Sequence, residues 1–248
     1  MTGGDFVTID ALERPAGGFL RWRRTVRAAL AGGIDGLRAA TVNHANDGTH
    51  RLVPRLVPAS GALVAAWDSP EAAQAAWNGP LREALEGRGH FGMDGEVARV
   101  RRNGEHDDWH GWNPSAEGTE PVAEDEPMVV AVHSILRPRH LPGFLRNNVH
   151  AASRAAHHPG HRGSMDVSSA LPFEHTSISL WKTRAQAEDY AYSPGGHAFA
   201  MKHALSAQTH HVGVFVRIRP LAATGPLGVD DAAFPALPPI ERGPGRAG

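Results

Sequence analysis

Apolar and polar positions follow the same order twice along the chain. Short β-branched runs at 6–12 and 128–136 predict strands, and each is followed by a proline, Pro15 or Pro138, at a position that suits the first turn of a helix. These first helices are expected to run to about residues 31 and 156. Further strands are predicted at 37–42, 61–67 and 95–102, and again at 163–170, 175–181 and 212–219. Ser69 and Thr183 are expected to cap second helices that run to about residues 85 and 205.

The amino-acid sequence itself also repeats. Val7–Pro15 (VTIDALERP) aligns with Val130–Pro138 (VAVHSILRP), and Leu63–Pro70 aligns with Ser177–Arg184. Matched blocks in one order indicate a duplicated β-α-β-β-α-β unit, which is the ferredoxin-like unit. Because its helices cover one face of its sheet only, the other face needs a partner sheet. We therefore expect an α+β fold of tandem ferredoxin-like modules packed sheet to sheet.

The expected domain boundaries follow from this repeat. Residues 1–105 form an N-terminal module that is mainly structural, and residues 128–220 form a C-terminal module that carries the active site. The polar segment 106–127 is interpreted as a linker that packs across the junction of the two modules through Trp109 and Trp112. A tail rich in Pro and Gly is expected at 221–248.

Composition narrows the chemistry. The 248 residues contain no cysteine and 16 histidines, with a formal net charge of −1. The lack of cysteine excludes disulfides, zinc–thiolate sites, iron–sulfur clusters and thiolate-ligated haem. The near-neutral charge argues against a nucleic-acid partner, and the longest apolar run, at 61–67, is too short to span a membrane. No signal peptide is visible at the N-terminus, so a cytoplasmic location is expected. Motifs typical of phosphate loops, serine hydrolases and zinc proteases do not occur.

The histidines concentrate in the second copy, where eleven of them lie between His133 and His211. His175, Ser177, Ser179 and Trp181 alternate along one strand and so share one face. The first copy has Leu63 and Ala65 where Ser177 and Ser179 stand, and Asp10 aligns with His133. This asymmetry places the site in the second copy. If the row faces the space between the sheets, it either lines a cavity or forms hydrogen bonds within an ordinary core.

His197 follows a Ser-Pro-Gly-Gly break and has small neighbours that leave room for a flat ligand. With no cysteine and only two tyrosines, the composition favours histidine as the haem ligand, if haem is bound. A capping or solvent-facing histidine is the alternative interpretation. His203 lies about 240° further round a helix and is a second candidate ligand. The His157-His158-Pro-Gly-His161 cluster is interpreted as a surface loop rather than a metal site.

Several segments together resemble spheroidene monooxygenase and its relatives. These segments are Trp109-His-Gly-Trp112, Arg137-Pro138, Phe144-Leu-Arg146, Ser153-Arg154-Ala155, Leu171-Pro-Phe-Glu-His175, Ser179-Leu-Trp181 and Gly196-His197. That family's enzyme is a haem-containing oxygenase that converts a methylene to a ketone. The resemblance implies a dimeric α/β-barrel type of fold, as in chlorite dismutase, dye-decolourising peroxidases and haem aldoxime dehydratases.

The resemblance also implies haem b in the C-terminal module, with His197 as the proximal iron ligand. Phe199, Met201 and Trp181 would contact the cofactor, and His175, Ser177 and Ser179 would be the catalytic groups on the distal side. The many histidines counted around the pocket, including His133 and His150, favour a substrate more polar than a carotenoid.

The leading hypothesis is a haem-dependent, monooxygenase-like oxidoreductase that acts on a small organic substrate of secondary metabolism. An electron donor and a homodimeric arrangement are partners that the sequence leaves open. One alternative is a haem-dependent dehydratase or rearrangement enzyme acting at a nitrogen substituent, as in aldoxime dehydratases. The others are a cofactor-free monooxygenase of the antibiotic-biosynthesis type and a binding protein without turnover.

Overall fold

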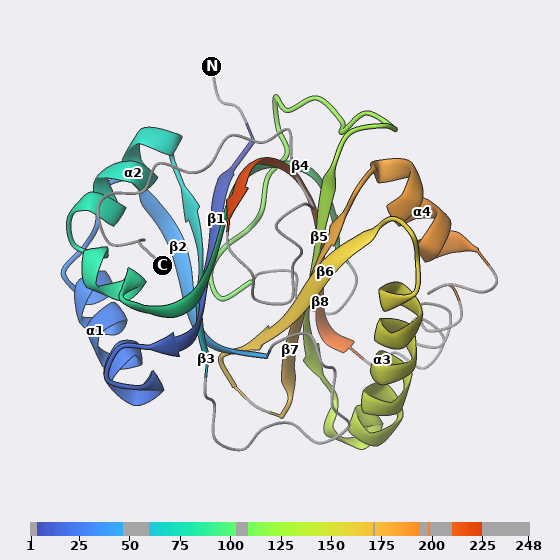
Figure 1. The fold of residues 1–248 in the computed structure, drawn as a ribbon, viewed down its shortest axis with the longest axis horizontal. Coiled ribbons are helices and arrows are strands. Elements are labelled where there is room, and N and C mark those ends of the chain that lie inside the picture. The colour runs from blue at the N-terminus through green and yellow to red at the C-terminus, as the bar shows by residue number, and fades with distance from the viewer. Residues whose placement is uncertain are drawn as a thin grey trace.

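The computed structural model describes residues 4–46, 60–102, 109–170, 172–193, 198 and 210–224, and they form two β-α-β-β-α-β units (Figure 1). The first unit contains β1 (Phe6–Pro15), α1 (Phe19–Ala31), β2 (Leu37–Asn46), β3 (Ser60–Trp67), α2 (Pro70–Asn78) and β4 (Gly87–Arg102). The second contains β5 (Met128–Leu136), α3 (Leu141–Ala156), β6 (His161–Ser168), β7 (Glu174–Trp181), α4 (Arg184–Tyr192) and β8 (His210–Thr224). Short 3-10 helices lie at Arg82–Leu85 and Pro138–His140.

The strands close into one barrel in the order β1-β3-β2-β6-β7-β5-β8-β4. Each unit contributes four neighbouring antiparallel strands, and the units join edge to edge at β2–β6 and β4–β8. The helices cover the outside of the barrel, with α1 and α2 over the first unit and α3 and α4 over the second (Figure 1). The prediction of an α+β fold built from tandem ferredoxin-like modules is confirmed.

The register of the strands corrects one detail of the sequence alignment. The matching pairs are Phe6–Trp67 in the first unit and Met128–Trp181 in the second. This register makes Asp10 the counterpart of Val132, and Ala11 the counterpart of His133. The alignment of Asp10 with His133 was therefore wrong by one residue. That alignment matched the two Arg-Pro pairs to each other, but the second pair lies one residue further from the start of its strand than the first does. A shift of one residue in the alignment moves a side chain to the opposite face of a strand.

Several element ends differ from the sequence-based expectation. Helix α2 stops at Asn78 rather than near residue 85, because Pro80 lacks an amide proton and disfavours helical geometry at Gly79. Strand β4 begins at Gly87, eight residues before its predicted start, and β8 continues to Thr224. The rest of the predicted tail, 225–248, lies outside the described residues. Helix α4 ends at Tyr192, where Ser193 is extended, rather than continuing toward residue 205. Both N-caps are confirmed: the Ser69 and Thr183 side chains accept hydrogen bonds from the backbone N–H groups three residues on.

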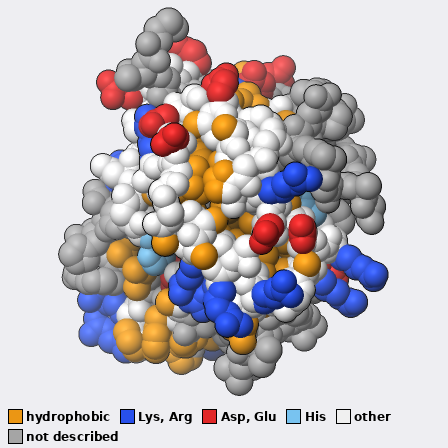
Figure 2. Space-filling model, turned by 90° about the vertical axis from the view of Figure 1, so that its left-hand side faces the viewer, with side chains coloured by type: hydrophobic (Ala, Val, Ile, Leu, Met, Phe, Trp, Pro, Cys, Tyr) orange, Lys and Arg blue, Asp and Glu red, His pale blue; other side chains and the backbone are white. Residues whose placement is uncertain are grey.

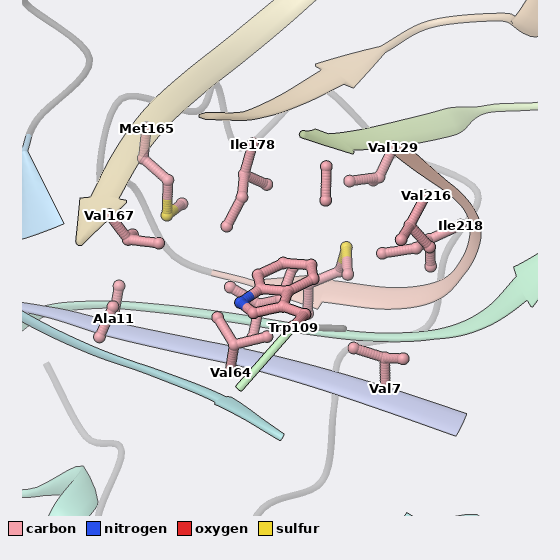
Figure 3. Packing of buried hydrophobic residues seen from close by; sticks show 14 of the residues in the cluster. Val7, Ala11, Val64, Trp109, Val129, Met165, Val167, Ile178, Val216 and Ile218 are labelled. Carbon is pink, nitrogen blue, oxygen red and sulfur yellow. The ribbon is translucent and has the colours of Figure 1, made fainter. Parts of the chain in front are cut away.

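The barrel interior is filled by apolar side chains from both units around Trp109 (Figure 3). The segment Trp109–Trp112 forms a narrow turn, in which the backbone N–H of each tryptophan donates to the carbonyl of the other at 2.7 and 3.0 Å. His110 and Gly111 at its tip have φ angles of 52° and 83°, the left-handed geometry of a tight hairpin turn. Trp109 and Trp112 are only 2% and 5% exposed. We name residues 109–112 the tryptophan hairpin.

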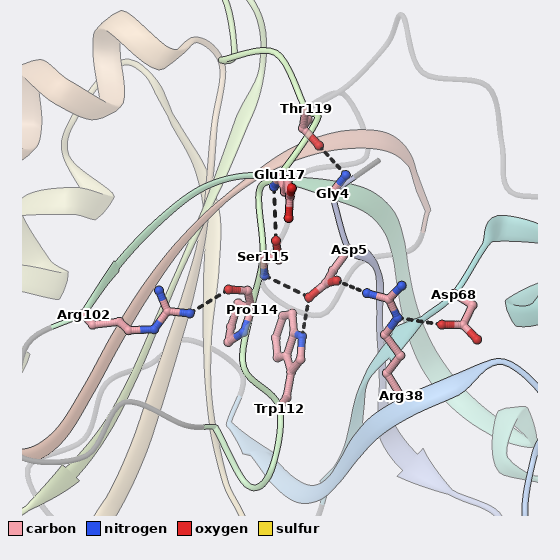
Figure 4. Close-up of polar contacts among 10 residues, drawn as sticks. All are labelled: Gly4, Asp5, Arg38, Asp68, Arg102, Trp112, Pro114, Ser115, Glu117 and Thr119. Carbon is pink, nitrogen blue, oxygen red and sulfur yellow. Dashed lines mark hydrogen bonds and ion pairs between the residues drawn. The ribbon is translucent and has the colours of Figure 1, made fainter. Parts of the chain in front are cut away.

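Asp5 fastens the tryptophan hairpin to the first strand (Figure 4). One of its carboxylate oxygens accepts from Trp112 Nε1 at 2.8 Å and from the backbone N–H of Ser115 at 3.0 Å. The other oxygen pairs with Arg38, which also donates to Asp68 at 2.7 Å. The carboxylate is 2% exposed, so these donors replace the water that it loses on folding.

The side of the molecule that carries the first unit mixes charges of both signs (Figure 2). Exposed Arg21, Arg24 and Arg27 lie on α1, while exposed Glu71 and Glu83 lie on α2 and the 3-10 helix that follows it. Within the described residues, no helix combines the length and the apolar character needed to cross a membrane.

Candidate functional site

The outer faces of the two four-stranded sheets differ sharply in chemistry. In the first unit, Leu63, Ala65 and Trp67 are at most 1% exposed beneath the apolar side chains of α1 and α2. At the equivalent positions of β7, Ser177 and Ser179 are half-buried and polar, and only Trp181 is fully buried. The asymmetry read from the sequence is therefore present in three dimensions. One unit seals its outer face and the other leaves it polar and partly open.

The row His175, Ser177, Ser179 and Trp181 does share one face, but that face points toward the helices. The intervening residues of β7, Ile178 and Leu180, belong to the barrel core. The sequence left open whether this row faces the space between the sheets, and in the structure it does not. The reason is that the buried tryptophan at the end of the row packs beneath α3 and α4, against Ala155 and Ala187, and this fixes the parity of the strand.

We use the name polar face for Val130, Val132, Asp166, His175, Ser177 and Ser179, which come from three adjacent strands. Ser177 lies opposite Val132 on β5 and opposite Asp166 on β6. Ser179 lies opposite Val130 in the same way. Small hydroxyl side chains thus run down the middle of this surface, with valines on one side and a carboxylate on the other.

His175 is held by groups from a neighbouring strand and from the helix above it. Its Nε2 lies 3.2 Å from Asp166 Oδ1 on β6 and 3.2 Å from Asn148 Nδ2 on α3. The ring of Phe144, also on α3, meets the imidazole edge-on at 5.1 Å. The His175 and Asp166 side chains are 16% and 12% exposed. A histidine whose ring nitrogen faces a carboxylate in a partly dry site is suited to hold and transfer a proton.

Trp181 closes one end of the polar face. Its Nε1 donates to Ser179 Oγ at 2.9 Å, and the Ser179 hydroxyl in turn lies 3.5 Å from the backbone carbonyl of Val130, to which it donates. The indole stacks on Tyr190 of α4, with ring centroids 4.9 Å apart. The tryptophan therefore orients one of the candidate serines and links it to α4.

The remaining predicted cofactor residues, His197, Phe199 and Met201, lie outside the described residues, and so does the second candidate ligand His203. Their roles stay predictions. Within the described part of the chain, no group of three or more His, Asp or Glu side chains is arranged to hold a metal ion.

His133 does not border the polar face. It is fully buried inside the barrel, where Nδ1 lies 2.9 Å from Thr176 Oγ1 and the ring stacks parallel to Trp109 at 5.0 Å. The expectation that His133 adds polarity to the pocket was therefore wrong, because His133 shares the inward face of β5 with Val129 and Ala131, which belong to the barrel core. His150 is exposed on α3.

Sequence reasoning missed Asp166, Asn148 and Phe144. A signal for each was present. Asp166 alternates with the apolar Met165 and Val167, and the ferredoxin-like order pairs its strand with the strand of His175. Phe144 and Asn148 are four residues apart, so a helix places both on one face.

Comparison with known proteins supports the fold. No protein-family model and no curated protein matches the chain. An aldoxime dehydratase structure matches with a TM-score of 0.52 and 10% identity, over 88% of this chain and 82% of that one. An aldoxime dehydratase in complex with butyraldoxime gives a TM-score of 0.50 and 10% identity, over 87% and 80%. A ferredoxin-fold protein related to antibiotic biosynthesis monooxygenases, from Listeria monocytogenes, matches with a TM-score of 0.32 and 14% identity, over 88% and 96%. At 10% identity, the likeness to the two aldoxime dehydratases is one of fold.

Proposed function

We propose that this chain is a haem-dependent oxidoreductase of the monooxygenase type, which acts on a small organic substrate at the polar face. The observation that carries the proposal is the His175–Asp166 pair on a half-buried surface of one unit only. If this surface had a structural role only, apolar side chains would be sufficient, as they are on the equivalent surface of the first unit. The first unit therefore shows how the same sheet face is built when it serves packing alone.

The residues of the polar face suit a flat, largely apolar cofactor. Val130 and Val132 are partly exposed beside the small Ser177 and Ser179, and Phe144 stands partly exposed on α3. A ring system can lie against such a surface without displacing bulky side chains. In this proposal His197 holds the iron, and Phe199, Met201 and Trp181 pack against the ring. When bound, haem supplies the oxygen or bond-rearranging chemistry, while the protein sets orientation and polarity.

The chain's own groups have distinct roles. The Asn148 side-chain amide donates to His175 Nε2, and the Asp166 carboxylate lies 3.2 Å from the same nitrogen. Together these groups fix the orientation of the imidazole and leave Nδ1 to carry the proton. His175 exchanges a proton with the substrate. Ser177 and Ser179 hydrogen-bond its polar substituent, and Phe144 covers the edge of the site.

A dehydratase is the second candidate, because the same pair can protonate a leaving hydroxyl group. An aldoxime that loses water gives a nitrile, and the departing hydroxyl needs a proton at its oxygen. A histidine oriented by a carboxylate can deliver that proton. The solved aldoxime dehydratases share the fold at TM-scores of 0.50 and 0.52.

The absorbance spectrum of protein expressed with a supply of haem tests the cofactor. Wild-type protein should show a Soret band, and His197→Ala should abolish or grossly shift it. His203→Ala is the matched control and should leave the band unchanged. An unchanged spectrum in His197→Ala would sink the ligand assignment, and colourless protein that consumes oxygen would indicate the cofactor-free alternative.

Butyraldoxime distinguishes the two reactions. A dehydratase should form butyronitrile from it without oxygen or a reductant, whereas a monooxygenase should form none and should need both. His175→Ala should lower the active reaction by at least tenfold in kcat while the Soret band stays in place, since general acid–base groups contribute about 10²–10⁴-fold. Full activity in His175→Ala would contradict the proton-transfer role.

A further inference from the structure

The start of α1 and the strand ends beside it form a surface rich in arginine. Segments 14–32 and 82–88 together contain seven arginines, two glutamates and no aspartate or lysine. Five of these arginines are exposed and form no ion pair with an acidic side chain of the described residues. We name them the arginine surface: Arg14, Arg21, Arg24, Arg27 and Arg88.

Strand pairing and helix packing bring the members of this surface together. Arg14 on β1 lies directly opposite Arg88 on β4. Both side chains project on the sheet face that α1 covers, because Leu12, two residues before Arg14, belongs to the apolar cluster beneath that helix. Trp22 of α1 donates its Nε1–H to the carbonyl of Ala84 at 2.9 Å and so fixes the helix beside β4. Like charges directly opposite each other are destabilising, and an anion beside them relieves the repulsion.

The acidic side chains nearby offset only part of this positive charge. Glu13 is next to Arg14 on β1 but projects from the opposite face of the strand, where it lies against Gly89. Glu83 and Glu86 are exposed on the segment that follows α2. The surface is therefore strongly positive, although the whole chain has a formal net charge of −1.

Helix α1 presents a large apolar side chain in the middle of these cations. Leu20, Arg24 and Arg27 follow helical spacing along its outward face. Leu20 is 70% exposed, more than any other large apolar side chain of the described residues. Residues 16–18, just before the helix, are exposed and carry no side chain larger than a methyl group. Figure 2 shows hydrophobic side chains along the lower edge of this face of the molecule, with Lys and Arg side chains around them.

We propose that the arginine surface binds an anionic lipid bilayer, with Leu20 inserted at the level of the headgroups. Lipid phosphates match the guanidinium forks, and the boundary of the acyl chains accepts the leucine. A nucleic-acid backbone would supply the anions but leave Leu20 in water. An acidic protein would need a pocket shaped for the protruding leucine, whereas a bilayer deforms around it. The inference does not rest on the proposed haem chemistry.

Cosedimentation of the purified protein with vesicles tests the proposal. Wild-type protein should bind vesicles of equal parts phosphatidylcholine and phosphatidylglycerol, should bind phosphatidylcholine vesicles far less, and should dissociate as salt is added. Arg21→Gln with Arg24→Gln should weaken binding about tenfold or more, because each cation near an anionic surface adds to the affinity. Arg101→Gln with Arg146→Gln removes the same charge from exposed arginines elsewhere, and this matched control should bind as wild type does.

A fluorescent label tests the contact of Leu20 with lipid directly. Because the chain contains no cysteine, one introduced thiol can be labelled alone. Leu20→Cys, labelled with a polarity-sensitive fluorophore, should shift its emission to shorter wavelength when the mixed vesicles are added. Phe173→Cys is the matched control, since Phe173 is an apolar residue of the second unit that is 43% exposed, and its label should keep its spectrum.

Three results would overturn the proposal: equal binding to the two kinds of vesicle, undiminished binding by a folded Arg21→Gln/Arg24→Gln variant, or an unchanged spectrum of labelled Leu20→Cys. Tighter binding of polyglutamate or duplex DNA than of the mixed vesicles would also overturn it, in favour of an acidic macromolecule. Arg14→Gln with Arg88→Gln repeats the test if circular dichroism shows that the first pair does not fold. His175→Ala should bind the vesicles normally, so failure of the haem proposal leaves these readouts intact.

Discussion

Glu174 shows how a single buried charge can join parts of the chain that are distant in sequence. It begins β7, is 3% exposed, and accepts hydrogen bonds from the backbone N–H and the hydroxyl of Ser169. His110, at the tip of the tryptophan hairpin, has its Nε2 3.1 Å from Glu174 Oε1, the same oxygen that accepts from the Ser169 backbone N–H. Burial raises the pKa of Glu174, but the hydrogen bonds from His110 and Ser169 outweigh burial and lower it to about 2. The carboxylate thus ties the hairpin to the second unit.

This lowered pKa predicts a specific pH dependence of stability. A carboxyl group that is more acidic in the folded state stabilises the fold above its unfolded pKa, near 4.5, and that contribution fades as the pH falls toward 2. We expect Glu174→Gln to lower the free energy of unfolding by about 3–4 kcal/mol at pH 7, because the pKa falls from 4.5 to about 2 and each pKa unit corresponds to about 1.4 kcal/mol. Urea unfolding at several pH values measures both the loss of unfolding free energy and the pH range over which it appears.

The control for this prediction is Glu83→Gln, an exposed residue after α2. It should change the free energy of unfolding little and preserve the slope between pH 4.5 and 2. If Glu174→Gln kept the wild-type slope in that interval, another group would be responsible for it.

At the scale of elements, the sequence predicted the order of strands and helices and the helix caps, because periodicity and local side-chain chemistry determine these. The eight predicted strands and four predicted helices occur in the predicted order, and Ser69 and Thr183 form both predicted helix caps. The placement of Pro15 in a first helical turn was wrong, because Pro15 ends β1 and α1 begins at Phe19. The direction of the His175 row was not predictable in the same way, because alternation defines two faces without saying which one is inside. The neighbours Asp166 and Asn148 depend on strand pairing and on helix placement, which a single sequence does not contain explicitly.

The tryptophan hairpin is the element that fills the barrel. Replacing Trp109 with Ala should leave a cavity in the core and cost about 3–5 kcal/mol of unfolding free energy. Trp109→Phe retains a ring and should cost less than half as much. Chemical unfolding monitored by far-ultraviolet circular dichroism measures both. A loss below 1 kcal/mol in Trp109→Ala would show that the hairpin is not part of the core.

The two helix caps form a matched pair for a second test. Ser69→Ala and Thr183→Ala each remove one acceptor for a backbone N–H at a helix start. Each should lower the free energy of unfolding by about 1 kcal/mol. Because α4 carries Tyr190, only Thr183→Ala should also disturb the near-ultraviolet signal of the Trp181–Tyr190 stack. Equal near-ultraviolet changes in both variants would contradict this.

At the scale of the molecule, the two units share one core. The cluster that surrounds Trp109 contains Val7 and Val64 from the first unit and Ile178 and Val216 from the second. Neither unit can open without exposing the apolar interior of the other. The barrel is therefore expected to behave as one cooperative structure despite its internal repeat.

This shared core predicts a single unfolding transition. Urea curves recorded by far-ultraviolet circular dichroism, by total tryptophan fluorescence and by near-ultraviolet circular dichroism should coincide. A substitution in either unit, such as Val64→Ala or Ile178→Ala, should shift all three curves together. Two separated transitions would mean that the units unfold independently.

The two joints between the units have a further consequence. At one joint His44 lies opposite Ser168, and at the other Glu96 lies opposite Arg219. The strand register shows that the two residues of each pair occupy equivalent positions in the two units. Each edge strand of one unit therefore pairs with the equivalent edge strand of the other. Two separate identical chains could build the same barrel, but both would then carry the same outer surface. When both copies lie in one chain, their sequences can differ. One copy can then keep an apolar outer face for packing while the other acquires the polar residues of a functional site.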